Sequence, residues 1–389
     1  MSLRYYIFLK DVLLLALTAF GGPQAHIAMM FKLLVEKRRY LSDQELIELN
    51  ALCQILPGPT STQTITAIGF KIGGPNLAYL TLLVWIMPAA TTMALAGFVI
   101  SYLQENNISL HFLSIVLPMA VSFVAYAAWK ISVKVVTTKI AVVLMVFAAI
   151  LSYFFRSPWV YPLLLISGGA VTALRFKQHP QEKDKKLDIQ WANFFLYVGV
   201  FILAAALGGA TSSLPVRLFE NFYRNGSMVF GGGQVLVPLM YTEFVQFKGY
   251  LTGEEFLSGY AIAQALPGPT FSFTAFVGNL AMREYGIAGQ FLGSFVATVG
   301  IFLPGTFLIF FVIRFWDGLK KYRVVRASLE GISAVSSGMV VAAAIMLYHP
   351  IDNTLLNFGI VVITFALLMF TRIPAPVLIL TGLLLGFVI

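Results

Sequence analysis

The chain has 389 residues, of which 59% are hydrophobic and only 11% charged, and its formal net charge is +9. Soluble domains carry about a quarter charged residues, so this composition excludes an ordinary soluble globular protein. Apolar runs such as 77–103, 110–136 and 286–313 are long enough to cross a bilayer. We therefore expect an all-α polytopic membrane protein.

The basic residues indicate how the chain is oriented. Lysines and arginines gather in short loops between the apolar runs, at 37–39, 130–139, 175–186 and 320–326. This is the pattern of cytoplasmic loops, so the positive charge does not indicate a nucleic-acid partner. The first apolar run is interrupted by Lys10 and lacks a small-residue cleavage site, and we interpret it as retained. We expect an integral protein of a prokaryotic plasma membrane with a cytoplasmic N-terminus.

The chain opens with a helix that is broken in the middle. The apolar run 5–36 is interrupted at Gly21-Gly22-Pro23. Because proline suits the first turn of a helix, we expect two half-helices, over 5–20 and 23–36.

A second interrupted helix follows. Ser42 and Glu45 form a capping box that opens a helix ending near Leu56. The segment Pro57-Gly58-Pro59 stops this helix, and a second arm begins at Thr60 and reaches Lys71. An arm of about 13 residues extends only ~20 Å, so neither arm spans a bilayer alone.

Ordinary spans complete the first half, and a second half repeats the plan. The predicted organisation is an N-terminal repeat (1–178), a cytoplasmic linker (179–190), an extra transmembrane helix (191–210) and a C-terminal repeat (211–389). The expected spans of the first repeat are 76–103, 110–136, 139–155 and 158–176. The expected elements of the second are a broken helix (215–247), a capped hairpin (252–284) and spans near 286–315, 324–348, 354–371 and 374–389.

Three motifs show that the halves are copies of one unit. Gln54-Ile55-Leu56-Pro57-Gly58-Pro59-Thr60 returns as Gln264-Ala265-Leu266-Pro267-Gly268-Pro269-Thr270, at an offset of 210 residues (267 − 57). The same offset carries Phe20-Gly21-Gly22-Pro23-Gln24 onto Phe230-Gly231-Gly232-Gly233-Gln234, and Tyr40-Leu41-Ser42 onto Tyr250-Leu251-Thr252. Chance does not hold three separated motifs in one ungapped register.

The loop charges indicate that the two copies are inverted. Lys71 and the cluster at 37–39 place the start of the span at 76 inside, whereas Arg314 and 320–326 place the end of span 286–315 inside. We expect inverted-topology repeats with broken helices and re-entrant hairpins at the membrane midplane. A kinked pair that crosses the membrane once is the alternative for each broken segment.

The breaks indicate a binding site for an anion. Irregular backbone inside a bilayer is tolerated only where it is buried in protein or lines a cavity, and discontinuous helices at matched positions mark a transporter's binding site. A helix begins after each break, at Pro23, Thr60, Gly233 and Thr270. Four helix N-termini would then direct free N–H groups toward the midplane, which favours an anion.

The residues at the breaks are neutral donors and turn formers, without carboxylates, and this suits an oxyanion. Removing an ion from water costs at least several kcal/mol, whereas each helix end contributes about 0.3–1 kcal/mol, so direct hydrogen bonds and retained water must contribute. We therefore expect a wet cavity. The candidate substrate-binding residues are Gly21, Gly22, Gln24, His26, Gln54, Pro57, Gly58, Pro59, Thr60, Ser61, Thr62, Gln63, Gly231, Gly232, Gly233, Gln234, Gln264, Pro267, Gly268, Pro269, Thr270 and Ser272.

Each motif also has a structural interpretation. Pro-Gly-Pro can be a kink and Gly-Gly a close helix contact, but two symmetric copies beside Gln and Thr favour a site. His26 could donate to an anion or carry a proton, yet its counterpart is Leu236, so a packing histidine is equally compatible. Arg217, Glu220 and Arg224 share one helix face, and we interpret them as interfacial ion pairs.

These motifs resemble those of a known family. Phe20-Gly21-Gly22-Pro23 with His26, and Pro57-Gly58-Pro59-Thr60, are similar to the N-terminal signatures of the chromate ion transporter family. Phe230-Gly231-Gly232-Gly233 with Pro238, and Gln264 to Thr270, are similar to the C-terminal ones. The resemblance covers nearly the whole chain and includes the two-domain arrangement of the long subfamily. It implies chromate export from the cytoplasm and chromate resistance, with sulfate as a structural mimic, and it leaves open whether protons or anion exchange supply the energy.

We expect a secondary active transporter of tetrahedral oxyanions that exports chromate. The alternatives are a passive anion channel and an exchanger of sulfate or another oxyanion. An enzyme is not expected, because the sequence shows no acidic pair at metal spacing, no nucleophile tied to a histidine and no nucleotide-binding glycine-rich loop. The single Cys53 excludes an internal disulfide. We expect no metal and no cofactor; the partners are the oxyanion and the lipid bilayer, and a homodimer is compatible with the sequence.

Overall fold

The computed structural model describes residues 3–20, 22–108, 111–155, 157, 159–174, 191–230, 233–315 and 323–388. Every regular element within these ranges is a helix, so the prediction of an all-α protein is confirmed. The predicted linker at 179–190 lies outside the described residues. Among the described helices, those long and apolar enough to cross a membrane occupy Thr60–Glu105, Val116–Val133, Ala192–Thr211, Arg283–Val312 and Ala327–Met346.

The elements of the first half follow the predicted order. They are α1 (Leu3–Thr18), α2 (Gly22–Met30), the π-helix η1 (Phe31–Lys37), α3 (Asp43–Ile55), α4 (Thr60–Glu105), η2 (His111–Leu113), α5 (Val116–Val135), α6 (Lys139–Phe154) and α7 (Val160–Ala173). Inside α4 the backbone leaves helical geometry at Gly73 and Gly74, and Gly74 has φ +74°. A short arm therefore ends there and a long span follows, as predicted.

The second half repeats these elements after the extra helix α8 (Ala192–Thr211). They are α9 (Leu214–Met228), η4 (Gly233–Val235), α10 (Leu236–Met240), the π-helix η5 (Tyr241–Phe247), α11 (Gly253–Ala265), η6 (Thr270–Ser272), α12 (Phe273–Ala281), η7 (Arg283–Tyr285), α13 (Gly286–Val312), α15 (Arg323–Met346), α16 (Leu355–Phe370) and α17 (Ala375–Val388). The two π-helices occupy matched positions, 31–37 and 241–247. One difference is that η4 and η6 open the second-half arms with a 3-10 turn, where the first-half arms begin as α-helix.

The Pro-Gly-Pro segments are hairpins, because an ion pair joins the far ends of their two arms. In the first half the capping box of Ser42 and Glu45 is formed, and Glu45 also receives Lys71 from the end of the second arm at 2.5 Å. This ammonium holds the pKa of the Glu45 carboxyl down to about 2. In the second half Glu255 caps α11 in the same way and pairs with Arg283. Each segment doubles back, which favours a hairpin over a kinked single crossing.

The two broken helices double back as well. Asp11 in α1 accepts hydrogen bonds from Arg38 and from the Tyr40 hydroxyl, both at 2.9 Å, so η1 returns toward α1. In the second half Arg224 of α9 bonds Glu243 of η5 at 3.1 Å. All four interruptions are thus the tips of folded-back segments, and their placement in a bilayer stays a prediction.

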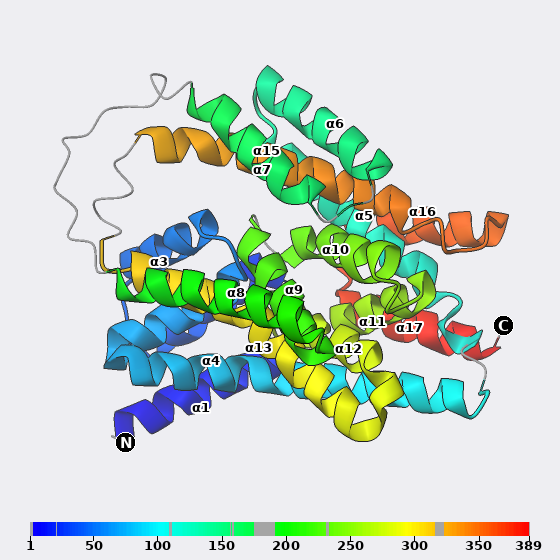
Figure 1. Ribbon diagram of the computed structural model, residues 1–389, viewed down its shortest axis with the longest axis horizontal. Coiled ribbons are helices and arrows are strands. Elements are labelled where there is room, and N and C mark those ends of the chain that lie inside the picture. The colour runs from blue at the N-terminus through cyan, green and yellow to red at the C-terminus, as the bar shows by residue number, and fades with distance from the viewer. Residues whose placement is uncertain are drawn as a thin grey trace.

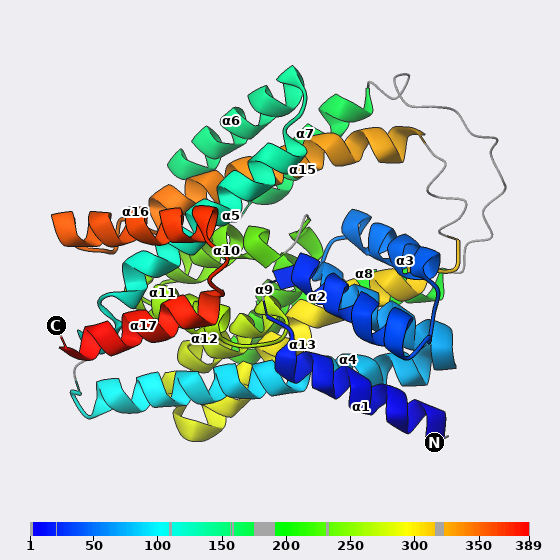
Figure 2. The same cartoon turned by 180° about the vertical axis from the view of Figure 1, so that it is seen from behind.

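The helices form two layers with the short arms between them (Figure 1). The later helices of both halves, α5, α6, α7, α15 and α16, pack together in one layer. The opposite layer contains α1, α4, α12 and α13, which also contact one another across the halves. Figure 2 shows from behind that α2, α3, α10 and α11 lie between the layers. The folded-back arms therefore occupy the interior of the molecule.

Arg224 corrects one interpretation of the sequence. Its side chain is 7% exposed and lies between Glu220 at 3.0 Å and Glu243 at 3.1 Å, and Glu243 is itself 1% exposed. Arg217 remains at the exterior, where it bonds the carbonyl of Gly208. The three residues are therefore not an interfacial ladder: Arg224 forms a buried ion pair that joins the two arms of the broken helix.

We predict that Arg224→Gln lowers the free energy of unfolding by about 3–5 kcal/mol, because it leaves the Glu243 carboxylate buried without its cation. Lys71→Met is the matched control, since it breaks a solvent-exposed ion pair and should cost about 0–1 kcal/mol. Unfolding of the purified protein in detergent micelles measures both. Equal losses for the two variants would contradict the assignment of Arg224 to a buried pair.

Candidate functional site

The four interruptions meet around one small cavity. Its lining comes from the first broken helix (Pro23, His26), the first hairpin (Pro59, Thr60, Ser61), the second broken helix (Gly233) and the second hairpin (Pro269, Thr270, Phe271). The chain thus brings together four segments whose lining residues are up to 248 residues apart (271 − 23). His26, Ser61 and Phe271 are each at most 3% exposed, so this part of the cavity is shielded from solvent.

A matched pair of backbone hydrogen bonds fixes the hairpin tips. The Gly58 N–H donates to the Val229 carbonyl at 2.7 Å, and the Gly268 N–H donates to the Ala19 carbonyl at 2.8 Å. Both bonds join the Pro-Gly-Pro turn of one half to the break of the other half. Gly58 has φ +122° and Gly268 has φ +104°, a region where residues with a Cβ are strained. The repeated glycine is therefore required by the turn that makes this bond.

One wall of the cavity is polar. The His26 Nδ1 lies 3.1 Å from the Ser61 hydroxyl, and the His26 Nε2 has no hydrogen-bond partner among the described residues. The edge of the His26 ring packs against Trp85, whose indole N–H donates to the Thr62 hydroxyl at 3.1 Å. Trp85 therefore packs against the imidazole beside the cavity.

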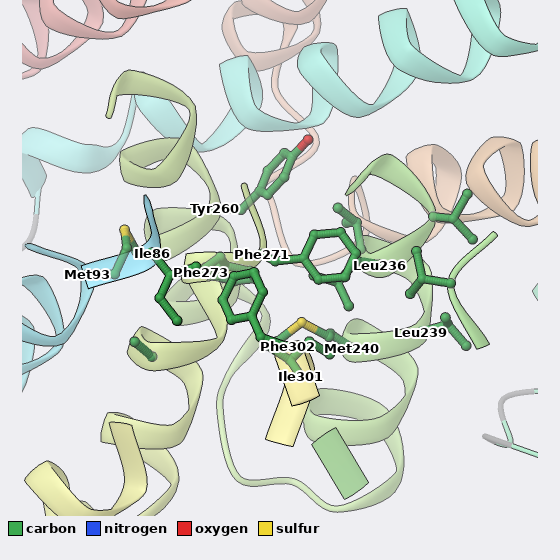
Figure 3. Close-up of a cluster of buried hydrophobic side chains, with 14 of the residues drawn as sticks. Ile86, Met93, Leu236, Leu239, Met240, Tyr260, Phe271, Phe273, Ile301 and Phe302 are labelled. Carbon is green, nitrogen blue, oxygen red and sulfur yellow. The ribbon is translucent and has the colours of Figure 1, made fainter. Parts of the chain in front are cut away.

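The second half lines the cavity with Gly233, Pro269, Thr270 and Phe271. Phe271 stands at the position equivalent to Ser61, and Leu236 at the position equivalent to His26. Figure 3 shows Phe271 and Leu236 in a buried apolar cluster that also contains Phe273 and Phe302. The Phe271 and Phe302 ring centroids are 6.1 Å apart. The two halves therefore differ at the cavity, where Ser61 of one half corresponds to Phe271 of the other.

The structure brings only part of the predicted site to the cavity. Of the candidate residues, those that line it are His26, Pro59, Thr60, Ser61, Gly233, Pro269 and Thr270. The glycines and prolines at Gly22, Pro57, Gly58, Pro267 and Gly268 form the surrounding turns. Gly21, Gly231 and Gly232 lie outside the described residues, as do the side chains of Gln24 and Gln234.

The remaining polar candidates lie elsewhere. The Gln63 amide donates to the carbonyls of Pro57 at 2.8 Å and Gly305 at 3.2 Å, so it braces the hairpin turn. Thr62 accepts from Trp85, and Ser272 is fully buried without lining the cavity. Gln54 is exposed and Gln264 is half-buried, and neither lines the cavity. The upstream glutamines are therefore not neighbours of the cavity in this conformation.

Sequence analysis missed two lining residues, Pro23 and Phe271. The 210-residue register contained the signal for Phe271, because it sets this ring opposite Ser61. Nothing in the sequence indicated that Glu243 would face Arg224, because the two belong to different arms.

The cavity offers hydroxyl groups and a histidine nitrogen, and no carboxylate lines it. Such a set of donors can bind an oxyanion. Among the described residues there is also no group of three or more His, Cys, Asp or Glu side chains that could hold a metal ion. The cavity volume is about 10 Å³, which is the room that one water molecule needs. A tetrahedral oxyanion is larger than water, so the walls must separate before one can enter.

Comparison with known proteins identifies the family. The chromate transporter family profile matches residues 7–174 and 216–387. The chain belongs to the chromate transporter family. The resemblance predicted from the motifs is thereby confirmed, and the two matched segments correspond to the two halves. Together with the apolar helices, membership in this transporter family identifies an integral membrane protein.

Individual relatives of the family cover most of the chain. It is 26% identical to a probable chromate transport protein of Synechococcus elongatus, over 94% of this chain and 91% of the relative. It is 27% identical to an uncharacterised transporter of Methanocaldococcus jannaschii, over 96% and 92% of the two chains. It is 26% identical to a chromate transport protein of Pseudomonas aeruginosa, over 85% and 77%. No solved structure matches the chain.

We predict that Gly58→Ala destabilises the protein more than Gly74→Ala. Both glycines have positive φ, so alanine is strained at each. A Cβ at Gly58 would also lie 2.9 Å from the Gln63 amide nitrogen and 3.3 Å from the Gly305 Cα, whereas a Cβ at Gly74 would meet nothing within 4 Å. Thermal unfolding in detergent gives the comparison, and equal losses would show that the hairpin tip is loosely packed.

Proposed function

We propose that this protein is a secondary active transporter of tetrahedral oxyanions that exports chromate from the cytoplasm and also accepts sulfate. The observation that carries the proposal is the meeting of all four interrupted helices around one cavity that contains donors and no carboxylate. The Synechococcus relative is named a probable chromate transport protein and the Pseudomonas relative a chromate transport protein, which supports chromate as the substrate.

The proposed site consists of the Thr60, Ser61 and Thr270 hydroxyls, the free His26 nitrogen and the backbone N–H groups at the arms that begin near Pro23 and Thr60. Removing a dianion from water costs several kcal/mol per charge even after relaxation. Hydrogen bonds to a charged group return about 1.5–3 kcal/mol each, so three or four donors and retained water can balance this cost. We expect modest affinity, as release on the far side requires.

The repeated architecture supports alternating access between the two sides of a prokaryotic plasma membrane. We propose that the halves are inverted in the membrane, with the N-terminus in the cytoplasm, and that the tips separate on one side at a time. The two cross-half bonds, Gly58 to Val229 and Gly268 to Ala19, contribute about 0.5–1.5 kcal/mol each. A bound anion can therefore replace them without a large barrier.

We predict that Thr60→Ala and Ser61→Ala each lower the specific rate of chromate and sulfate transport about 10- to 100-fold, because each removes a donor to the anion. Thr381→Ala is the matched control, since its hydroxyl is exposed and bonds only the Val377 carbonyl in its own helix. Uptake of labelled chromate and sulfate into proteoliposomes under imposed pH and anion gradients measures the rates. Full activity of both cavity variants would refute the site.

The same proteoliposomes distinguish a carrier from a channel. A carrier moves the anion at a saturable rate that follows the imposed gradient of a coupled ion. A conductance without such coupling, recorded across a planar bilayer, would replace the proposal with that of a passive anion channel.

A further inference from the structure

We propose that the Phe271 side chain takes the volume of the anion when the site is unloaded, so that the protein can close and reset without carrying a counter-anion. This inference rests on the proposed function of the central cavity as an oxyanion site. It adds a mode of transport, net movement of the anion, and assigns that mode to one residue.

The closed cavity is too small for the proposed anion. About 10 Å³ remains between the four tips, which accommodates no tetrahedral oxyanion. The conformation is nevertheless tightly joined, since both cross-half hydrogen bonds are formed at 2.7 and 2.8 Å. The fold therefore has a closed arrangement that does not require the anion between its walls.

The Phe271 ring occupies space beside the cavity. Phe271 lines the cavity, is 2% exposed, and stands where the other half has the small, hydrogen-bonded Ser61. Its ring edge lies against the second broken helix, because a Cβ built on Gly233 would be 3.7 Å from the Phe271 Cε2. The ring is thus placed between the second hairpin and the second broken helix, where a serine would leave room for polar atoms.

The Phe271 ring and an anion cannot occupy the closed cavity at the same time. The His26 Nε2 is buried without a partner on the wall that also carries Ser61, so the polar wall keeps an unmet hydrogen-bonding group while the ring fills the volume. An anion in the cavity would satisfy that group and would require the ring to withdraw. Phe271 therefore stabilises the closed conformation without anion and opposes the closed conformation with anion.

The stability of the unloaded closed state decides whether the carrier performs exchange or net transport. A carrier that closes only when loaded performs obligatory exchange, whereas a carrier with a stable unloaded closed state returns by itself and performs net transport. Replacing Phe271 by serine removes the packing of the unloaded closed state and makes room for the anion in the closed state. Both changes move the protein from net transport toward exchange.

The test compares two rates in proteoliposomes loaded with labelled sulfate, with the membrane potential clamped. Net efflux is measured into gluconate medium, and exchange into medium with unlabelled sulfate. For the unsubstituted protein we expect net efflux at a rate similar to exchange. For Phe271→Ser we expect the ratio of net efflux to exchange to fall about tenfold or more while exchange persists, which corresponds to a shift of about 1.4 kcal/mol.

Two further variants make the result specific. Phe273→Ala removes an equally buried ring, 1% exposed, that lies two residues away and does not line the cavity. It should change both rates in parallel and leave their ratio unchanged. Phe271→Leu keeps an apolar side chain in the cavity and should keep the ratio close to that of the unsubstituted protein.

Three results would overturn the inference. They are an unchanged ratio in Phe271→Ser, an equal fall of the ratio in Phe273→Ala, and an unsubstituted protein that exchanges sulfate but shows no net efflux. The comparison of net efflux with exchange in the unsubstituted protein needs no variant. The inference can therefore be refuted even if Phe271→Ser folds poorly. Absence of both rates for sulfate and chromate would instead refute the proposed function.

Discussion

The architecture depends on two backbone hydrogen bonds that cross between the halves. Each Pro-Gly-Pro turn donates one N–H to the carbonyl at the break of the opposite broken helix, Gly58 to Val229 and Gly268 to Ala19. An interrupted helix leaves backbone groups unpaired, and a bilayer offers no water to satisfy them. At each break, a carbonyl of one half accepts a hydrogen bond from the Pro-Gly-Pro turn of the other half. For this reason the four tips meet at one place, and neither half is complete alone.

Different interactions hold the folded-back segments and their tips. Charged side chains close each folded-back segment away from its tip, through Lys71 and Glu45, Arg283 and Glu255, Asp11 and Arg38, and Arg224 and Glu243. At the tips, two neutral backbone bonds join the halves. Each of these two bonds contributes about 0.5–1.5 kcal/mol, which is comparable to an exposed ion pair such as that of Lys71 with Glu45.

Duplication built a symmetric frame, and substitution then made its centre asymmetric. The π-helices, the capping boxes and the positive-φ glycines Gly58 and Gly268 occupy matched positions in the two halves. At the cavity, however, Ser61 of one half corresponds to Phe271 of the other, and His26 lines the cavity whereas its counterpart Leu236 does not. One half supplies His26 and Ser61 and the other Phe271, whereas each half supplies one threonine, Thr60 or Thr270.

The sequence by itself determined the helical class, the duplication and the places where the helices break. These features follow from local chemistry: apolar runs of membrane length, Ser or Thr three residues before Glu, and proline and glycine inside helices. The 210-residue register also aligns Ser61 with Phe271, although the sequence did not show that both residues line one cavity. The hydroxyls of Thr60, Ser61 and Thr270 lie at the cavity because they immediately follow the breaks.

Only the tertiary structure decided which side chains share space across the chain. Gln63 and Gln54 resemble donors in the sequence, but the first braces a turn against Gly305 and the second is exposed. The sequence suggested an interfacial position for Arg224, but in the structure Glu243 of η5 lies beside it and both side chains are buried. The cavity volume, too, depends on the packing of four segments at once. Local patterns specify where a helix starts and stops, whereas the direction of a side chain and the room around it depend on contacts between distant segments.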